Sequence, residues 1–156
     1  MIEVRNITKS FDGKTILNDV SAVFKAGKTN LIIGQSGSGK TVLMKSIVGL
    51  LRPDSGEILY DGRDFLKMDS REVKMLRREI GMLFQGSALF DSETVLGNVM
   101  FPLVMFSDMS QEEMLERAHF CIERVNLKGA DSKYPSEISG GMQKRVAIAR
   151  AIALNP

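Results

Sequence analysis

The sequence predicts an α/β fold that is followed by a helical block. Three observations point to it: short strand-like runs in the first half, a glycine-rich loop between an apolar run and a helix, and helical spacing after Gln85. The 156 residues are 44% hydrophobic and 26% charged, a composition that suits one globular domain. We therefore expect one domain over 1–156, with an α/β core at 1–86 and a helical subdomain at 87–156.

Strand patterns dominate the first part of the chain. Asp12-Gly13 and Asp61-Gly62 are turn signals that each follow such a run. Two compact apolar runs, one before the glycine-rich loop and one before Gln85, are typical of buried parallel strands. The expected strands lie at 2–7, 16–24, 29–33, 57–60 and 80–84, and the sheet is expected to combine a parallel part with an antiparallel β part.

Helical spacing of apolar residues predicts the helices. Ser110 and Glu113 form a capping-box pattern, and Ala118 and Ile122 follow on one face of the helix that it starts. The expected helices lie at 41–51, 70–79, 110–125 and 140–153.

Composition excludes several classes of protein. The net charge is only +2, so a nucleic-acid partner is not expected. The single cysteine, Cys121, can form no internal disulfide, which suits a reducing compartment. The apolar run at 99–106 is broken by Pro102 and is too short to span a bilayer, and the N-terminus lacks a secretory signal pattern. We expect a cytoplasmic protein that reaches a membrane only through a partner.

The strongest motif is a phosphate loop, G-x-x-x-x-G-K-[ST], at 34–41. Its glycines permit positive φ angles and a close approach of backbone N–H groups to phosphate. Lys40 supplies a cation for the β- and γ-phosphates, and the Thr41 hydroxyl is a hard oxygen ligand for Mg²⁺. The expected nucleotide-binding residues are Gly34, Gln35, Ser36, Gly37, Ser38, Gly39, Lys40, Thr41 and Val42.

A second anion site is expected about a hundred residues later. Ser139 is a good helix N-cap, and Gly140 and Gly141 expose backbone N–H groups at the start of a helix. By itself this pattern is also typical of a plain helix N-terminus. The phosphate loop upstream, and the apolar run that ends at Phe84-Gln85 between the two motifs, favour a binding role.

The order of these motifs resembles the ATP-binding subunits of ABC transporters. That family has a phosphate loop, a glutamine at a strand end (here Gln85), a helical block and a signature close to L-S-G-G-Q, here 138–142. The resemblance runs from residue 2 to residue 156. It implies an ABC-type phosphate-loop NTPase core with a helical subdomain, ATP and Mg²⁺ as ligands, and ATP hydrolysis that drives transport.

The resemblance also implies roles for single residues. Phe11 stands where an aromatic side chain stacks on adenine, although the family more often has tyrosine there. Gln85 resembles the glutamine that contacts Mg²⁺ and the attacking water, so the implied catalytic set is Lys40, Gln85 and Ser139, with Thr41 and Gln85 at the metal. Residues 139–141 would meet the γ-phosphate held by a second copy in a head-to-tail dimer. Met142 replaces the usual glutamine, which leaves open any contact made by that side chain.

A finer resemblance concerns the transported molecule. Residues 81–90, Met142 and residues 149–153 are similar to the ATPases of Mla/Mce-type phospholipid transport complexes. An integral membrane permease is then the implied partner, with the ATPase on the cytoplasmic side, peripheral to the inner membrane. The apolar stretch at 95–109 is a candidate docking surface, with core packing as the alternative that its composition favours.

Family elements that carry the Asp-Glu pair and the catalytic histidine would follow residue 156. His119 lies inside an amphipathic helix and is expected to be a helix-face residue. We therefore expect residues 1–156 alone to hydrolyse ATP poorly, and to swap elements with another copy or to need further chain in order to cover residues 31–33.

Three alternatives stay open at this point. Within the family, the rival is the ATPase of an amino-acid, metal or lipoprotein transporter. A second class is an ABC-type ATPase that acts on DNA or ribosomes, which the near-neutral charge disfavours. A third is an unrelated phosphate-loop kinase or GTPase, which would not need residues 139–141.

Overall fold

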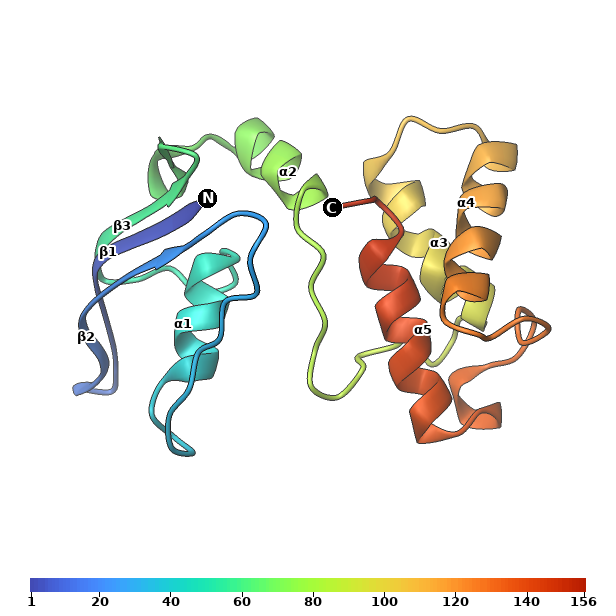
Figure 1. Ribbon diagram of the computed structural model, residues 1–156, viewed down its shortest axis with the longest axis horizontal. Coiled ribbons are helices and arrows are strands. Elements are labelled where there is room, and N and C mark those ends of the chain that lie inside the picture. The colour runs from blue at the N-terminus through green and yellow to red at the C-terminus, as the bar shows by residue number, and fades with distance from the viewer. The chain divides into compact units, whose positions relative to one another are not determined.

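The computed structural model describes residues 1–156 and divides into two compact units, Met1–Lys74 and Met75–Pro156 (Figure 1). The first unit contains β1 (Ile2–Phe11), β2 (Lys14–Phe24), α1 (Lys40–Ile47), β3 (Ser55–Tyr60), β4 (Arg63–Asp64) and the 3₁₀ turn η1 (Phe65–Lys67). Helix α2 (Ser70–Arg78) runs across the division. The second unit contains α3 (Val95–Phe106), α4 (Gln111–Arg124), the 3₁₀ turn η2 (Pro135–Glu137) and α5 (Gly140–Ile152).

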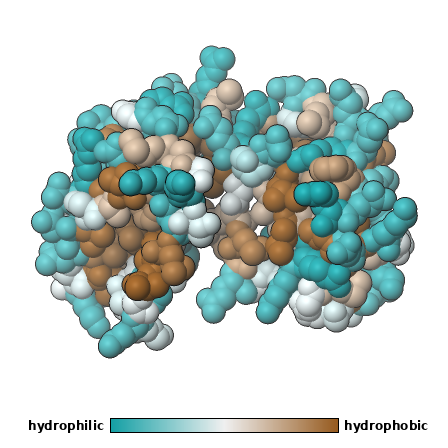
Figure 2. Space-filling view, in the orientation of Figure 1, coloured by the Kyte–Doolittle hydropathy of each residue, from teal (hydrophilic) through white to brown (hydrophobic).

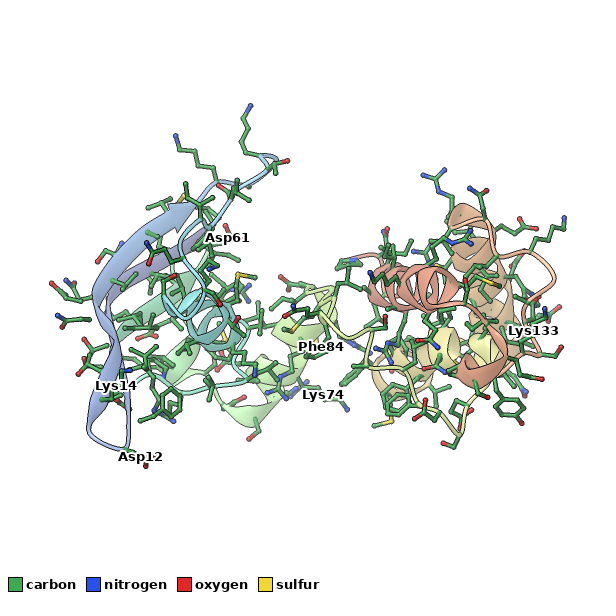
Figure 3. All side chains as sticks on the ribbon, turned by 90° about the horizontal axis from the view of Figure 1, so that it is seen from below. Asp12, Lys14, Asp61, Lys74, Phe84 and Lys133 are labelled. Atoms are coloured by element: carbon green, nitrogen blue, oxygen red, sulfur yellow. The ribbon has the colours of Figure 1, made fainter.

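The four strands form one antiparallel sheet in the order β2-β1-β3-β4. Asp12 and Gly13 connect β1 and β2 with φ angles of 49° and 77°, the two left-handed residues of a tight hairpin turn. Figure 3 shows Asp12 at the tip of this hairpin, next to Lys14 where β2 begins. Asp61 and Gly62 repeat the pattern between β3 and β4 with φ angles of 47° and 80°. Both predicted turns are confirmed.

Helix α1 packs beside this sheet and completes the core of the first unit (Figure 1). Val4 and Ile58 lie opposite each other in the β1–β3 ladder and are almost fully buried, because alternate residues of a strand point to one face. The Tyr60 hydroxyl donates a 2.6 Å hydrogen bond to the carbonyl of Ile47 at the end of α1, and burial raises the pKa of Tyr60 to about 12. The core residues contributed by the strands and α1 are Val4, Ile7, Leu17, Leu43, Ile47, Ile58, Leu59 and Tyr60.

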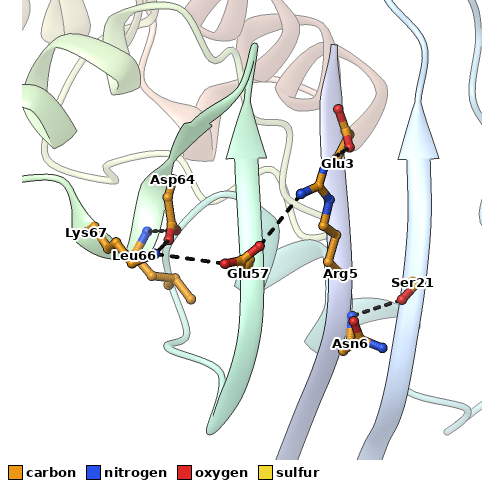
Figure 4. A network of polar contacts seen from close by, with 8 residues as sticks. All are labelled: Glu3, Arg5, Asn6, Ser21, Glu57, Asp64, Leu66 and Lys67. Carbon is orange, nitrogen blue, oxygen red and sulfur yellow. Dashed lines mark hydrogen bonds and ion pairs between the residues drawn. The ribbon is translucent and has the colours of Figure 1, made fainter.

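Charged side chains join the strands on their exposed face (Figure 4). Arg5 of β1 donates to Glu3 at 2.7 Å and lies 3.8 Å from Glu57 of β3. Lys67 lies 3.9 Å from Glu57 and 2.8 Å from Asp64. Of these pairs only Arg5–Glu57 joins two paired strands, and it agrees with the β1–β3 register, in which the two residues lie opposite each other.

Helices α3, α4 and α5 pack on one another in the second unit. The predicted capping box is present, because Ser110 Oγ accepts from the Glu113 amide and the Glu113 carboxylate accepts from the Ser110 amide. Arg145 of α5 donates to the carbonyls of Val125 and Asn126, which lie just beyond the end of α4. Their hydrophobic core cluster consists of Val95, Val99, Leu103, Ala118, Cys121, Ile122, Leu127, Ala130, Ile138, Val146, Ala149 and Ala153.

Two predicted strands are wrong. Residues 29–33 and 80–84 belong to no strand, and every ladder of the sheet is antiparallel. A strand exists only where its backbone groups pair with a neighbour, and these two runs have no neighbour in the ladders. Leu31 and Ile33 are each 81% exposed. Figure 2 shows hydrophobic residues at the surface of the first unit.

The helix predicted at 41–51 ends earlier, at Ile47. Gly49 has a φ of 72°, its amide donates to the Ser46 carbonyl, and the Leu50 amide donates to the Lys45 carbonyl. This is a Schellman motif, which terminates a helix with a left-handed residue. The other expected helices are confirmed within one or two residues at each end.

The expected division into 1–86 and 87–156 stays a prediction, and the compact units divide after Lys74. No helix combines the length and the apolar content that a membrane span requires.

Candidate functional site

The glycine-rich loop at 34–41 leads directly into α1. Gly37 and Gly39 have φ angles of 80° and 90°, a region that residues with a side chain rarely adopt. Gly39 also lies against β2: a Cβ there would stand 3.0 Å from Leu17 Cδ2 and 3.1 Å from the carbonyl oxygen of Ile16. The loop conformation and its contact with the sheet therefore both require glycine at position 39.

Lys40 folds back over the loop that precedes it. Its Nζ donates hydrogen bonds to the carbonyls of Gly34 (2.8 Å) and Gln35 (2.7 Å). Gly34 lies close to Ser38, because a Cβ at position 34 would stand 2.6 Å from Ser38 Oγ. The ammonium group is therefore held against the loop by backbone carbonyls. When a nucleotide binds, phosphate oxygens can replace these carbonyls as its hydrogen-bond acceptors.

The start of α1 is not capped by any side chain. Its N-cap residue is Gly39, and its first turn contains no acidic residue. The first-turn N–H groups and the positive end of the helix dipole therefore remain available to an anion. The Thr41 side chain is exposed on the same turn.

Phe11 lies in the same pocket as this loop. The pocket has a volume of about 340 Å³ and is lined by Phe11, Ile16, Gly37, Gly39, Lys40, Thr41 and Val42. Phe11 is 41% exposed, and Lys9 Nζ lies 5.4 Å from the centre of its ring. The side chain of Lys9 is held in turn by Asp54 at 2.6 Å, and this contact lowers the pKa of Asp54. The structure thus brings Phe11 to the loop, and its stacking on adenine stays a prediction.

The donor set at the loop suits Mg²⁺ that arrives with a nucleotide. The chain has no cluster of three or more His, Cys, Asp or Glu side chains that could hold a metal ion without another ligand. The exposed Thr41 hydroxyl offers one hard oxygen next to the phosphate-binding amides. Mg²⁺ is commonly held by few protein oxygens together with phosphates and water, so this single ligand fits the ion.

The second predicted anion site is a helix N-terminus, as expected. Ser139 is the N-cap of α5, and its Oγ accepts from the Met142 amide at 3.3 Å. Gly140 and Gly141 are exposed, and a Cβ on Gly140 would meet no atom within 4 Å. Met142 is partly buried and packs against the helical core. Its partly buried side chain therefore has a packing role.

Gln85 lies in a turn of the second unit and is exposed. The two residues that follow Gly86, Ser87 and Ala88, have φ angles of 62° and 48°. The loop at 34–41 and Phe11 belong to the first unit, whereas Gln85 and residues 139–141 belong to the second. The structure therefore assembles the first half of the predicted site, and the roles of the other residues stay predictions.

Two residues near Gln85 were not expected to matter. Arg150 of α5 donates to the Ser87 carbonyl at 2.9 Å, and Asn98 of α3 is fully buried with its amide hydrogen-bonded at both ends. A signal for Asn98 was present, because it is the only polar residue between Leu96 and Phe106. Arg150 has no such signal, since its partner is 63 residues away.

Two further expectations concern the helical unit. His119 lies on the exposed side of α4, with Nε2 3.4 Å from Asp131 Oδ1, as a helix-face residue would. The apolar stretch at 95–109 contains both core residues and exposed residues that could form a docking surface. Val99 and Leu103 are buried in the core, whereas Val104 and Met105 of α3 are more than half exposed.

The sequence matches known proteins over almost its whole length. Residues 17–156 match the family described as ABC transporter. The intermembrane phospholipid transport system ATP-binding protein MlaF of Haemophilus influenzae is 42% identical over 156 residues, 100% of this chain and 59% of that protein. The methionine import ATP-binding protein MetN of Carboxydothermus hydrogenoformans is 43% identical over 159 residues, 100% of this chain and 47% of that protein. The chain spans about half the length of these curated relatives.

Solved structures show the same fold. The dimeric, post-hydrolysis ATP-binding cassette MJ0796, bound to ADP and Pi, superposes with a TM-score of 0.91 at 36% identity, over 100% of this chain and 71% of that one. The predicted fold class is therefore confirmed, although two of its expected strands are not formed by residues 29–33 and 80–84.

Proposed function

The chain belongs to the ABC transporter family, and from this premise we propose that it is the ATP-binding part of a subunit whose ATP hydrolysis drives the transport of phospholipid. The observation that carries the proposal is the pocket in which Lys40, the uncapped start of α1 and Phe11 converge. Lys40 and the amides of α1 suit phosphate, the Thr41 hydroxyl suits the metal, and the Phe11 ring suits the base.

Lys40 and the first-turn amides of α1 would bind the β- and γ-phosphates. The Lys40 ammonium would leave the carbonyls of Gly34 and Gln35 for phosphate oxygens. Thr41 Oγ1 would hold Mg²⁺, which supplies charge neutralisation at the phosphates, and the Phe11 ring would cover the base. Gln85 would orient the attacking water, because phosphoryl transfer depends on positioning and electrostatics.

A second copy would complete each site. The backbone amides of residues 139–141 are exposed at the start of α5 and suit an anion. In a head-to-tail pair they would meet the γ-phosphate held by the loop of the other copy. The similar cassette MJ0796 is dimeric with ADP and Pi bound, which supports a pair of copies.

A membrane permease is the proposed partner, with the ATPase peripheral to the cytoplasmic face of the inner membrane. The outer face of α3 presents Phe101, Val104 and Met105, which are 40%, 59% and 51% exposed. Apolar side chains gathered in this way suit a docking surface for a segment of the permease.

Phospholipid is the proposed cargo because residues 81–90 and Met142 resemble the Mla-type ATPases, and MlaF is 42% identical to this chain. MetN is 43% identical, so an importer of a small amino acid is the second candidate. The two separate in vesicles that contain the full-length protein and its permease: ATP-dependent transfer of labelled phospholipid supports the first, and ATP-dependent methionine uptake supports the second.

The shared site is tested by Ser139→Arg in the full-length protein. The long arginine side chain would fill the space where the γ-phosphate of the other copy should lie, so the clash should abolish ATP-driven dimerisation. ATP binding, measured by a fluorescent analogue, should stay within about twofold, because the loop at 34–41 is untouched. Dimerisation that persists in the variant would contradict the shared site.

Hydrolysis by residues 1–156 alone should be far slower than by the full-length protein. A steady-state phosphate-release assay on the two proteins compares them directly. Equal turnover would contradict this expectation.

A further inference from the structure

A buried polar cluster lies between α3, α5 and the segment that follows Gln85. Asn98 is fully buried, and its Oδ1 accepts from the Phe90 amide at 2.9 Å. Its Nδ2 donates to the carbonyls of Phe90 (3.1 Å), Glu93 (3.1 Å) and Thr94 (3.0 Å). A shift of the segment would break these bonds and leave the buried amide of Asn98 unsatisfied, so one side chain specifies the path of residues 90–94.

Arg150 joins this cluster from α5. Its Nη2 donates to the Ser87 carbonyl at 2.9 Å, its Nη1 lies 3.5 Å from Asn98 Oδ1, and its guanidinium carbon lies 5.6 Å from the centre of the Phe90 ring. Burial lowers the pKa of Arg150, yet arginine stays charged at neutral pH. The charge is therefore held in a partly buried place by a carbonyl, an amide and an aromatic face.

The turn that Arg150 contacts has an unfavourable backbone conformation. Ser87 and Ala88 both have positive φ angles, and neither is glycine. Such residues persist only where the surroundings determine the conformation. The Ser87 amide donates to the Phe84 carbonyl and the Ala88 amide to the Gly86 carbonyl, and Arg150 adds a bond from outside the turn. Ser87 stands two positions after Gln85, so the contact with Arg150 also constrains the position of Gln85.

We propose that Arg150 and Asn98 are positioning residues for Gln85, which fasten the loop at 85–90 to the helix that begins at residues 139–141. This inference rests on the proposed function. Helix α5 is one rigid element of 13 residues with the second anion site at its start and Arg150 near its end. A γ-phosphate that engages residues 139–141 would therefore also place Gln85, in one movement of the helical unit.

The test uses the full-length protein in its complex with the permease. Arg150→Met removes the guanidinium and keeps an apolar stem, and it should lower kcat about tenfold while the affinity for ATP changes less than about twofold. The matched control is Arg145→Met on the same helix, which also loses two backbone carbonyls as partners, but at the end of α4. This control should keep kcat within about twofold of the parent.

A cycle with Gln85→Ala separates positioning from a general loss of stability. If Arg150 acts through Gln85, adding Arg150→Met to Gln85→Ala should lower kcat by less than about twofold more. Additive losses in the double variant would overturn the proposal. Arg150→Lys keeps the charge but lacks the planar guanidinium with its two donor arms, so it should show an intermediate kcat. It serves as the readout if Arg150→Met does not fold.

Hydrogen exchange gives a readout independent of activity. The Phe90 amide should exchange at least about tenfold faster in Arg150→Met and in Asn98→Ala than in Arg145→Met. Equal protection in all three variants would overturn the proposal. A parent protein that binds and hydrolyses no ATP would instead refute the proposed function, so the two failures are distinguishable.

Discussion

Lys40 carries the only positive charge that lines the pocket of the phosphate loop. Its two hydrogen bonds to loop carbonyls hold the ammonium where phosphate oxygens would lie. A charge-assisted hydrogen bond is worth roughly 1.5–3 kcal/mol, so this one side chain accounts for a large part of the expected affinity.

Lys40→Met should weaken ATP binding by about tenfold or more, because the charge is lost while the length of the side chain is kept. Lys45→Met, on the last turn of the same helix and exposed, is the control and should change binding less than about twofold. Titration with a fluorescent ATP analogue measures both. Equal affinities for the two variants would place the phosphates elsewhere.

In the first unit, stability depends on glycine at position 49. A Cβ at this position would stand 2.2 Å from Cζ of Phe65, and φ is already 72°. Gly49→Ala should therefore destabilise the protein by about 2–4 kcal/mol, through overpacking and left-handed strain together.

Gly27→Ala is the matched control for Gly49→Ala, with a similar φ of 65° and no atom within 4 Å of the added Cβ. It should cost about 1 kcal/mol, the strain alone. Urea unfolding followed by circular dichroism compares the two. Equal costs would mean that the ring of Phe65 can move aside.

At the scale of elements, the N-termini of α1 and α4 illustrate two uses of a helix start. The first turn of α4 is satisfied by its own side chains, Ser110 and Glu113, and the helix is a packing element. The first turn of α1 has a glycine N-cap and no side-chain acceptor. Of these two helix starts, α1 leaves its first-turn amides to water or to a bound anion, so it is the better suited of the two to bind phosphate.

Ser110→Ala should destabilise the helical unit by about 1 kcal/mol at neutral pH, since it removes an N-cap. Hydrogen bonds from the Ser110 backbone and hydroxyl lower the pKa of Glu113 below its ordinary 4.5. The carboxylate therefore contributes stability above pH 4.5 that is lost as the pH falls through its lower folded pKa. The difference in thermal unfolding between parent and variant should become smaller in acid, because the bond from the Ser110 hydroxyl to the Glu113 carboxylate is lost from the parent there while the bond from the Glu113 amide to Ser110 Oγ is kept.

Ser132→Ala is the control for the capping box, because this side chain is exposed and has no hydrogen-bond partner. Its difference from the parent should be small at every pH. A Ser110→Ala difference that grows in acid would contradict the role assigned to the Glu113 carboxylate.

For the whole molecule, the most consequential feature is an apolar backbone segment without a ladder partner. Leu31 and Ile33 have the largest exposed fractions among the large hydrophobic residues. Unpaired apolar segments of this kind associate with other chains unless they are covered. In the chain's longer relatives, further residues are available to cover such a segment.

Residues 1–156 alone should therefore self-associate at micromolar concentration. The double substitution Leu31→Glu and Ile33→Glu should shift the population toward monomer, whereas Met44→Glu, on an exposed position of α1, should not. Size-exclusion chromatography with light scattering measures the masses. A monodisperse monomer of the parent chain would contradict the prediction.

Local chemistry was sufficient for much of this protein. The turns at Asp12 and Asp61, the caps at Ser110 and Ser139, and the helix after the phosphate loop follow from neighbouring residues, because turns and caps close within a few positions of the chain. The end of α1 at Ile47 was also readable from Gly49, a left-handed helix terminator that the apolar spacing of 41–51 concealed.

Long-range pairing decided which apolar runs became strands and which distant side chains came into contact. Residues 29–33 and 80–84 have the composition of buried strands, but a strand forms only where another backbone offers hydrogen bonds, and no pattern within the segment supplies that partner. The link from Arg150 to Asn98 and Ser87 spans 52 and 63 residues, so only the packing of α3 against α5 reveals it. Composition selects which residues are able to pair, whereas the fold selects which of them meet.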